Sequence, residues 1–206
     1  MPKPLDPRSL SAFHARLPYG ERLSAEPVLG GAFFPFDGDV SVVPLDEPVV
    51  PEPQRQGEGG AGCLRCEHPD KDTIWRDARW RVHLVDEPVG LPFMACLAPL
   101  EHTTLSAMRP EVVADLGPLI QRVAAAIGRI EGVGRAHFSR WGDGSEHFHL
   151  WFLARPLGMM QMRGAMLAVW DDLLPRVPDS ERSAAAGVVA AALAEGGGEA
   201  VGDGLR

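Results

Sequence analysis

The stretch HFHLWFL, residues 147–153, alternates side chains that can act in a functional site with purely apolar ones. Successive side chains of a β-strand point to opposite faces of the sheet, so His147, His149 and Trp151 are expected to share one face. The Phe and Leu side chains are expected to share the other. Two imidazoles on one face of a strand are seldom packing residues. The stretch therefore predicts a strand over residues 146–153 that combines a functional face with a core face.

Patterns on either side of this stretch predict an antiparallel sheet with one long helix. Apolar residues recur at helical spacing from 110 to 130, and Pro110 suits the first turn of a helix. These elements predict an α+β fold, an antiparallel β-sheet with one long helix packed on it. The strands are expected at residues 73–77, 79–85, 93–97 and 136–140, the last joined to 146–153 by a Gly-Asp-Gly turn at 142–144, and weaker helical patterns cover 160–174 and 183–194.

Composition divides the chain into three parts. The N-terminal part is rich in Pro and Gly, with short strands expected at 28–36 and 40–45 and a flexible linker at 51–62. The last ten residues are expected to be disordered. The expected parts are an N-terminal extension over 1–60, the sheet domain over 61–176, and a C-terminal helix with its tail over 177–206.

Charge and hydropathy exclude several classes of partner. The 206-residue chain has 20 basic and 28 acidic residues, a formal charge of -8, and no visible basic patch. This charge disfavours binding to nucleic acid or to an anionic membrane. The N-terminal residues lack the apolar core of a signal peptide, and no apolar run approaches the length of a membrane helix. We expect a cytoplasmic protein.

Two of the three cysteines predict a metal site. Cys63 and Cys66 have the spacing at which one loop brings both thiolates to a tetrahedral zinc ion. His102 follows the strand expected at 93–97, and His147 lies at the start of the strand expected at 146–153. Both can therefore lie near one end of the sheet. The four residues would complete a zinc site. His68 is a rival for one ligand position.

A redox role for the cysteine pair is the alternative to metal binding. A Cys-x-x-Cys of the thioredoxin type needs a helix that starts at the motif. Here the motif is followed by a proline and by strand signals. Metal binding is therefore favoured.

The His-x-His-x-Trp pattern after a Gly-Ser-Glu turn resembles the His-φ-His-φ-His signature of the histidine triad superfamily, over roughly residues 62–156. In layout the chain is similar to the branch that contains galactose-1-phosphate uridylyltransferase. The resemblance implies a histidine triad-like fold, and it implies that His149 attacks the α-phosphorus of a nucleotide to form a nucleotidyl-histidine. It implies hydrolysis or transfer of a nucleotidyl group from a small-molecule nucleotide or nucleotide conjugate, and a homodimer. The metal ligands that it implies are Cys63, Cys66, His102 and His147.

The third motif position departs from the family pattern. It is Trp151, where triad enzymes have His and the transferase branch has Gln. Indole donates one N–H but cannot shuttle a proton. Ser145 and Arg163 are further candidates for phosphate binding, and the alternative that the sequence favours for Arg163 is a solvated surface residue. A register with Ser145, His147 and His149 as the three motif positions would make His147 the nucleophile, but the cysteine pair favours His147 as a metal ligand.

Three functions fit these residues. The first is an enzyme with His149 as nucleophile and a structural zinc. The second is a non-catalytic protein that binds a nucleotide or a partner. The third is a hydrolase in which zinc itself is catalytic, which four protein ligands disfavour.

Several other residues are expected to be structural. His83 and His137 lie on predicted strands, where a lone histidine more often serves the structure. The methionines at near-helical spacing after the motif are expected to line the core: Met159, Met160, Met162 and Met166, together with Trp170.

Overall fold

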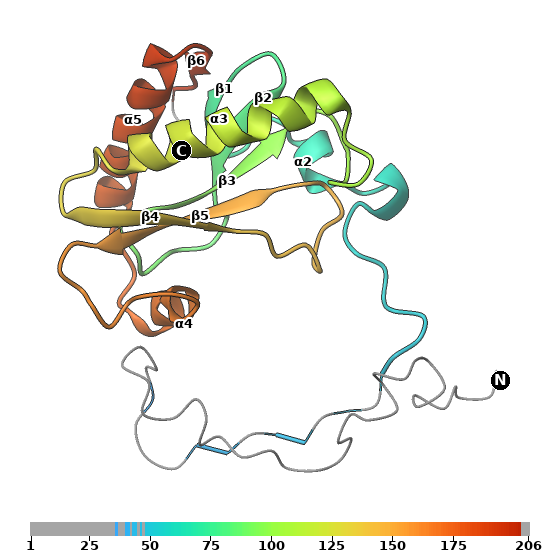
Figure 1. The fold of residues 1–206 in the computed structure, drawn as a ribbon, viewed down its shortest axis with the longest axis horizontal. Helices are drawn as coiled ribbons and strands as arrows, with labels where there is room; N and C mark the ends of the chain where they lie inside the picture. Colours follow the sequence, from blue (N-terminus) through green and yellow to red (C-terminus); the bar gives the residue numbers. More distant parts are fainter. Residues whose placement is uncertain (1–35, 37–39, 42, 45, 47, 203–206) are drawn as a thin grey trace. The chain divides into compact units, whose positions relative to one another are not determined.

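The structure, a computed structural model, describes residues 36, 40–41, 43–44, 46 and 48–202. The chain divides into two compact units, residues 1–54 and residues 55–206. The strand expected at 28–36 lies, apart from Phe36, outside the described residues. Of the strand expected at 40–45, residues 40, 41, 43 and 44 are described, and they do not form a strand. The second unit holds the sheet and the helices considered below (Figure 1).

A six-stranded sheet forms the centre of the second unit, and its strand order is β4-β5-β3-β2-β1-β6. Every pair of neighbouring strands is antiparallel. The predicted α+β fold with an antiparallel sheet is confirmed. The strands are β1 (Thr73–Arg76), β2 (Trp80–Leu84), β3 (Met94–Pro99), β4 (Val133–Ser139), β5 (Leu150–Pro156) and β6 (Glu199–Ala200).

The functional strand begins later than its sequence pattern predicts. It was expected from residue 146, whereas β5 starts at Leu150 and a long loop, not a tight turn, joins it to β4. The backbone before β5 is bonded elsewhere, since Glu146 N donates to Gln56 O at 3.0 Å and Phe148 N donates to Thr103 O at 2.8 Å. These hydrogen bonds hold the loop against two other segments instead of against β4.

The same hydrogen bonds show that part of the linker predicted at 51–62 is ordered. Gln56 N also donates to the Gly144 carbonyl at 3.0 Å, and a short 3-10 helix, η2, covers Glu58–Gly60. Residues 55–62 are therefore part of the compact second unit. Their Gly and Pro content suggested flexibility, but it could not reveal this pairing with a distant loop.

The long helix lies where its apolar spacing predicts it. Helix α3 spans Pro110–Ile127 and has its proline at the start. The second helix is shorter than expected: α4 spans Met166–Leu173, and Gly164 just before it has a φ of 65°, which a helix cannot accommodate. The third is longer: α5 spans Asp179–Glu195. A four-residue helix, α2, covers Leu64–Glu67.

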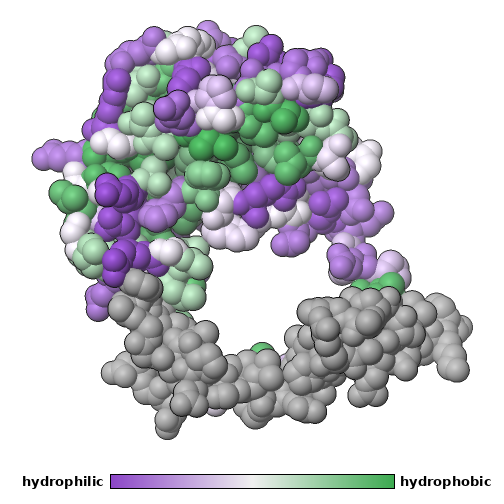
Figure 2. Space-filling model, viewed as in Figure 1, coloured by the Kyte–Doolittle hydropathy of each residue, from purple (hydrophilic) through white to green (hydrophobic). Residues whose placement is uncertain are grey.

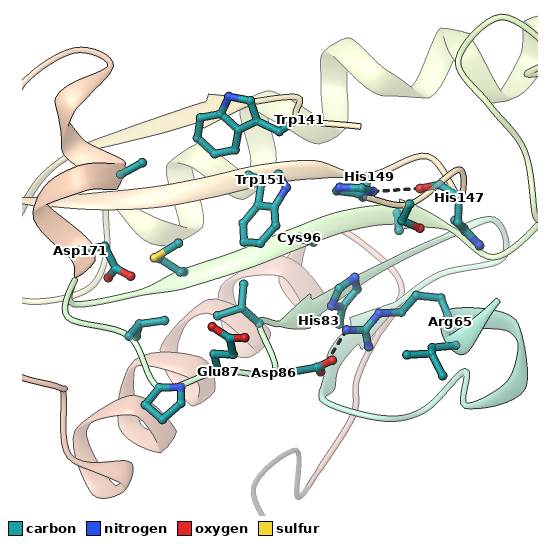
Figure 3. Close-up of a pocket in the computed structure, with 18 of the residues that line it drawn as sticks. Arg65, His83, Asp86, Glu87, Cys96, Trp141, His147, His149, Trp151 and Asp171 are labelled. Atoms are coloured by element: carbon teal, nitrogen blue, oxygen red, sulfur yellow. Dashed lines mark hydrogen bonds and ion pairs between the residues drawn. The ribbon is translucent and has the colours of Figure 1, made fainter. Parts of the chain in front are cut away.

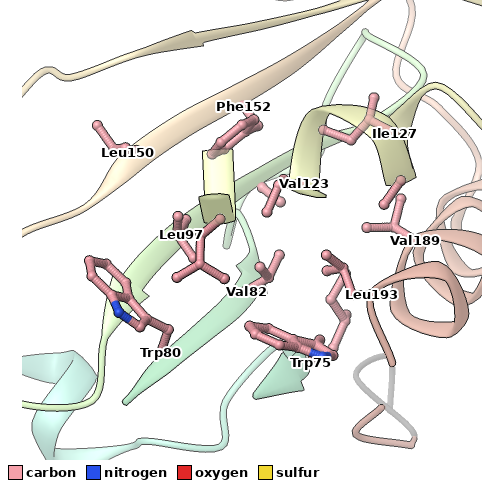
Figure 4. Close-up of a cluster of buried hydrophobic side chains, with 14 of the residues drawn as sticks. Trp75, Trp80, Val82, Leu97, Val123, Ile127, Leu150, Phe152, Val189 and Leu193 are labelled. Atoms are coloured by element: carbon pink, nitrogen blue, oxygen red, sulfur yellow. The ribbon is translucent and has the colours of Figure 1, made fainter. Parts of the chain in front are cut away.

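The two faces of the sheet have different partners. On one face α3 and α5 pack on the strands and form the larger core, and Figure 4 shows Val123 of α3 beside Phe152 of β5 and Val189 of α5 near Ile127 of α3. On the other face α4 covers a smaller cluster that includes Leu167 and Leu153. Figure 1 shows α4 on the side of the sheet away from α3. The smaller cover leaves room for a cavity on this second face.

The C-terminal segment is more ordered than its composition suggests. Strand β6 pairs with β1, and Trp75 Nε1 donates to the Gly197 carbonyl at 3.0 Å. The expectation of disorder is wrong for residues 197–202, because the indole and the sheet edge bind this backbone. Residues 203–206 lie outside the described part of the chain.

The expected core role of the methionines holds for only part of the set. Met162 is 5% exposed and belongs to the smaller cluster, with Trp170 packed against it. Met159 and Met160 are 41% and 54% exposed, so their predicted place in the core is wrong. They lie in the turn before α4, where the helical spacing assumed for them does not exist.

Figure 2 shows hydrophobic side chains among hydrophilic ones on the face where α3 lies. Val113 of α3 and Phe138 of β4 are 41% and 52% exposed. A second copy of the chain could cover such side chains, and the expected homodimer stays a prediction.

None of the helices in the described residues has the length and apolar character that crossing a membrane requires.

Two adjacent valines of α5 test whether this helix contributes to the core. Val189 is 0% exposed in the larger cluster, whereas its neighbour Val188 is 39% exposed. Val189→Ala is expected to lower the free energy of unfolding by roughly 2 kcal/mol, since it removes two buried carbon atoms and leaves a cavity. Val188→Ala should change it by less than about 0.5 kcal/mol. Urea unfolding of both variants measures the difference, and equal effects would contradict the packing described here.

Candidate functional site

Two cysteines and two histidines from three distant segments meet at one end of the sheet. The ligand atoms of Cys63, Cys66, His102 and His147 all lie within 4.8 Å of one another, and these residues are the group in the described part of the chain that could hold a metal ion. Cys63 precedes α2, His102 follows β3, and His147 lies in the loop before β5. Cys63 and His147 are each 1% exposed.

The distances within this cluster fit a tetrahedral zinc ion. Cys63 Sγ lies 3.4 Å from His147 Nδ1, and Cys66 Sγ lies 3.5 Å from the same nitrogen and 3.6 Å from His102 Nδ1. Zinc binds thiolate sulfur at about 2.3 Å and imidazole nitrogen at about 2.0 Å, so the tetrahedral angle puts sulfur and nitrogen about 3.5 Å apart. The four side chains are therefore arranged so that they could hold one tetrahedral metal ion.

Hydrogen bonds fix which nitrogen of each histidine faces the cluster. His147 Nε2 donates to the Pro99 carbonyl at 2.9 Å, and His102 Nε2 donates to Glu146 Oε2 at 3.3 Å. The hydrogen bond from His102 lowers the pKa of Glu146, so the acceptor is a carboxylate. Both Nδ1 atoms are left with a lone pair for a metal, and outer-shell partners of this kind are typical of histidine ligands.

Burial sets the protonation of two of these groups when no metal is bound. It lowers the pKa of His147 to about 4, so the imidazole is neutral at pH 7. It raises the pKa of the Cys66 thiol to about 11, and the neighbouring Cys63 adds to this shift. A bound metal ion would displace the Cys66 proton, because only the thiolate is a good ligand.

The two alternatives for the cysteines have different outcomes. His68 is exposed and does not belong to the cluster. Helix α2 does start directly after Cys63, so the argument that the motif lacks a helix is wrong. The helix is only four residues long, and the two imidazoles at ligand distance are what favours a metal over redox chemistry.

A cavity of about 470 Å³ adjoins the cluster on the face of the sheet opposite the larger core. Figure 3 shows His149 and Trp151 above it, and His83, Arg65 and Asp86 below. The residues that line it are Gln56, Leu64, Arg65, His83, Val85, Asp86, Glu87, Pro88, Val89, Met94, Cys96, Ala98, Trp141, Ser145, His147, His149, Trp151, Ala168, Asp171, Asp172 and Arg176.

His149 is held in one tautomer beside this cavity. Its Nδ1 donates to the His147 carbonyl at 2.8 Å, which leaves the lone pair on Nε2. Figure 3 shows the far side of the ring directed toward Trp151. In this tautomer the imidazole presents the lone pair of Nε2 to the cavity, as a covalent catalyst requires.

The structure brings two of the three predicted phosphate-binding residues to the cavity. Ser145 and Trp151 line it, and the Trp151 ring lies 6.0 Å from His149 and 6.1 Å from Trp141. Trp151 Nε1 is buried and finds no hydrogen-bond acceptor among the described residues. Arg163 is not part of the lining, and its Nε donates to the Met160 carbonyl at 2.7 Å instead.

Several lining residues were not predicted from the sequence. His83, set aside as structural, is 4% exposed and lines the cavity. Arg65 and Asp86 form an ion pair of 3.1 Å at its edge. Asp171 of α4 accepts hydrogen bonds from Gly90 N and Leu91 N at 2.7 and 2.8 Å, which holds the loop between β2 and β3. The alternation along β2 was a usable signal for His83, but the other residues have no shared motif.

No protein-family model and no curated protein matches the chain. Solved structures that are similar to this chain include histidine triad proteins and uridylyltransferases. A zinc-bound histidine triad family protein from Mycobacterium smegmatis is 22% identical, with 61% of this chain and 85% of that chain covered and a TM-score of 0.46. A Hit-like protein involved in cell-cycle regulation from Bartonella henselae is 13% identical, with 62% and 92% covered and a TM-score of 0.42. A uridylyltransferase is 19% identical, with 65% of this chain but only 44% of that chain covered and a TM-score of 0.46.

Removal of single ligands tests the metal site. Purified protein is expected to hold one zinc ion per chain, measured by metal analysis after dialysis. Cys63→Ser and His147→Gln should lower zinc affinity by more than the roughly 10- to 100-fold that loss of an outer-shell hydrogen bond costs. His68→Gln is the matched control and should keep wild-type affinity in a chelator competition. Two outcomes would refute this ligand set: loss of zinc from the His68→Gln variant, or wild-type protein that contains no zinc.

Proposed function

We propose that this chain is a zinc-binding histidine triad-like enzyme that cleaves a nucleoside phosphoester through a nucleotidyl-histidine at His149. The observation that carries the proposal is the state of that imidazole. Its Nδ1 is tied to the His147 carbonyl, and its Nε2 is directed to a cavity of about 470 Å³, large enough for a nucleotide.

In the first step the Nε2 lone pair attacks the α-phosphorus. The P–N bond forms while the bond to the leaving oxygen breaks, and the leaving group takes the electron pair. Positive charge then develops on the ring, and the hydrogen bond from Nδ1 to the His147 carbonyl stabilises it. In the second step an oxygen of water, or of an acceptor phosphate, bonds to the same phosphorus while the P–N bond breaks and its electron pair returns to Nε2. Attack by water gives hydrolysis and releases a proton to the solvent, attack by the acceptor phosphate gives transfer, and His149 is regenerated.

Trp151 narrows the choice of leaving group. An indole N–H can donate a hydrogen bond to a phosphate oxygen, but it cannot give up its proton to the leaving group. The substrate should therefore carry a leaving group that departs as a stable anion, such as a phosphate. Nucleoside diphosphate sugars and dinucleoside polyphosphates meet this condition, whereas phosphoramidates and alkyl esters need a proton donor.

The metal has a structural part in this proposal. Zinc held by Cys63, Cys66, His102 and His147 would join the segments around the site and fix the loop that ends in His149. Four protein ligands saturate a tetrahedral ion and leave no position for water, which disfavours zinc as the catalyst. A cytoplasmic location remains part of the proposal.

The second candidate is a non-catalytic protein that binds a nucleotide or another partner in the same cavity. The presence of Trp151 at the third motif position favours it, because that position lacks a proton donor. Turnover at His149 separates the two candidates, since only the enzyme forms a covalent intermediate.

An intact-mass experiment tests covalent catalysis. Incubation with uridine diphosphate glucose or a diadenosine polyphosphate at neutral to alkaline pH is expected to add one nucleotidyl group, mapped to His149 by peptide analysis. His149→Ala should abolish the adduct and the released product. His137→Ala is the control, because His137 lies on β4 and does not line the cavity. If none of these substrates gives an adduct or a product, the non-catalytic candidate is favoured.

A second test concerns the unpartnered indole nitrogen. Trp151→Phe keeps an aromatic ring and removes only the N–H donor. It is expected to weaken binding of a nucleoside monophosphate roughly tenfold and to leave binding of the nucleoside unchanged, since only the phosphate offers an acceptor there. Calorimetry with both ligands measures the difference, and an equal loss for both would show that the N–H does not contact phosphate.

A further inference from the structure

Three side chains form a row across neighbouring strands on the cavity face. The strand register pairs His83 of β2 with Cys96 of β3, and Cys96 with Trp151 of β5. All three line the cavity. Neighbouring strands lie about 4.8 Å apart, so the Cα atoms of His83 and Trp151 are about 10 Å apart, with Cys96 midway.

The middle member of the row is small, and its neighbours are large. Cys96 is 4% exposed, and burial raises the pKa of its thiol to about 12, so the thiol stays protonated and unreactive. Its small side chain forms the floor of the cavity between His83 and Trp151. An imidazole and an indole rise on either side of it. Figure 3 shows Trp151 and His83 on opposite sides of this part of the cavity. The row therefore creates a hollow between two polar rings.

His83 is held in a single state. Its Nδ1 lies 3.0 Å from the Leu84 carbonyl, and because a carbonyl only accepts, Nδ1 carries the proton. Burial is the largest cause that lowers the pKa of His83, to about 3, and the positive charge of Arg65 adds to it. The ring is thus neutral at physiological pH, and Nε2 is an obligatory acceptor.

The two polar rings of the hollow have opposite needs. His83 Nε2 is buried without a hydrogen-bond donor among the described residues, and Trp151 Nε1 is buried without an acceptor. An unsatisfied buried polar atom costs roughly 1–3 kcal/mol, so such atoms in a cavity indicate groups that a ligand completes. A ligand that satisfies both must offer an acceptor at one end and a donor at the other.

We infer that His83, with Cys96 as floor, forms a specificity subsite that accepts a hydrogen bond from a hydroxyl or amino group of the nucleoside part of the substrate. The inference rests on the proposed function and adds to it the chemistry of substrate selection. With phosphate at Trp151 and His149, the nucleoside reaches across the hollow toward β2. A phosphate ester without a donor on its organic part would leave His83 unsatisfied and would bind less well.

Calorimetry of the zinc-loaded full chain tests this subsite. All variants carry His149→Ala, so that no turnover occurs. The ligands are adenosine monophosphate, inosine monophosphate and 2′,3′-dideoxyadenosine monophosphate. His83→Phe, which keeps a flat ring without an acceptor, should weaken adenosine monophosphate binding about tenfold. If the donor is a ribose hydroxyl, the same substitution should leave the affinity for 2′,3′-dideoxyadenosine monophosphate unchanged. If the donor is the amino group of the base, it should leave the affinity for inosine monophosphate unchanged. His83→Gln, which retains an acceptor, should restore part of the affinity.

A steric variant tests the hollow without touching either ring nitrogen. Cys96→Leu fills the floor and is expected to reduce binding of all three ligands, with thermal melting and zinc content confirming the fold. Unchanged binding in Cys96→Leu, or in a folded His83→Phe variant with all three ligands, would overturn the subsite. If these ligands bind and His149 forms its adduct while the His83 variants have no effect, only this inference fails. If the parent chain binds no nucleotide, the proposed function fails with it.

Discussion

The alternation of core-facing and site-facing side chains over residues 147–152 is the constraint on which the site depends. Phe148, Leu150 and Phe152 are buried in the larger core, so their neighbours must face the opposite side. That side presents His147 to the metal cluster, and His149 and Trp151 to the cavity. A shift of one residue would expose three large apolar side chains and bury both imidazoles in the core. Core packing therefore sets the position of His149, the nucleophile of the proposed function.

The group of Cys63, Cys66, His102 and His147 fixes where this segment starts. His147 comes from the loop before β5, while the two cysteines come from a segment more than eighty residues earlier in the sequence. Backbone bonds from Gln56 and Thr103 to the same loop hold it from two sides. A short segment without regular secondary structure is thus positioned by long-range contacts. This explains how His149 keeps a defined orientation although it lies outside β5.

The cavity exists because the two faces of the sheet are covered unequally. Helices α3 and α5 close one face, whereas the shorter α4 closes only part of the other. Buried polar groups in proteins are nearly always hydrogen-bonded, and exceptions need a reason. Two of the exceptions here, on His83 and Trp151, line the same cavity. Both are explained if the cavity is built around a ligand with separate donor and acceptor groups.

The sequence by itself determined the local features of this protein. Alternation predicted which side chains of 147–153 share a face, helical spacing predicted α3, and the chemistry of cysteine and histidine pointed to the four residues that the fold brings together. These features depend on neighbours along the chain. The ordering of residues 55–62 and 197–202, the start of β5 at Leu150, and the place of His83 in the cavity were decided only by the tertiary structure. Each depends on a partner far away in sequence, and composition carries no information about which distant backbone or side chain will supply it.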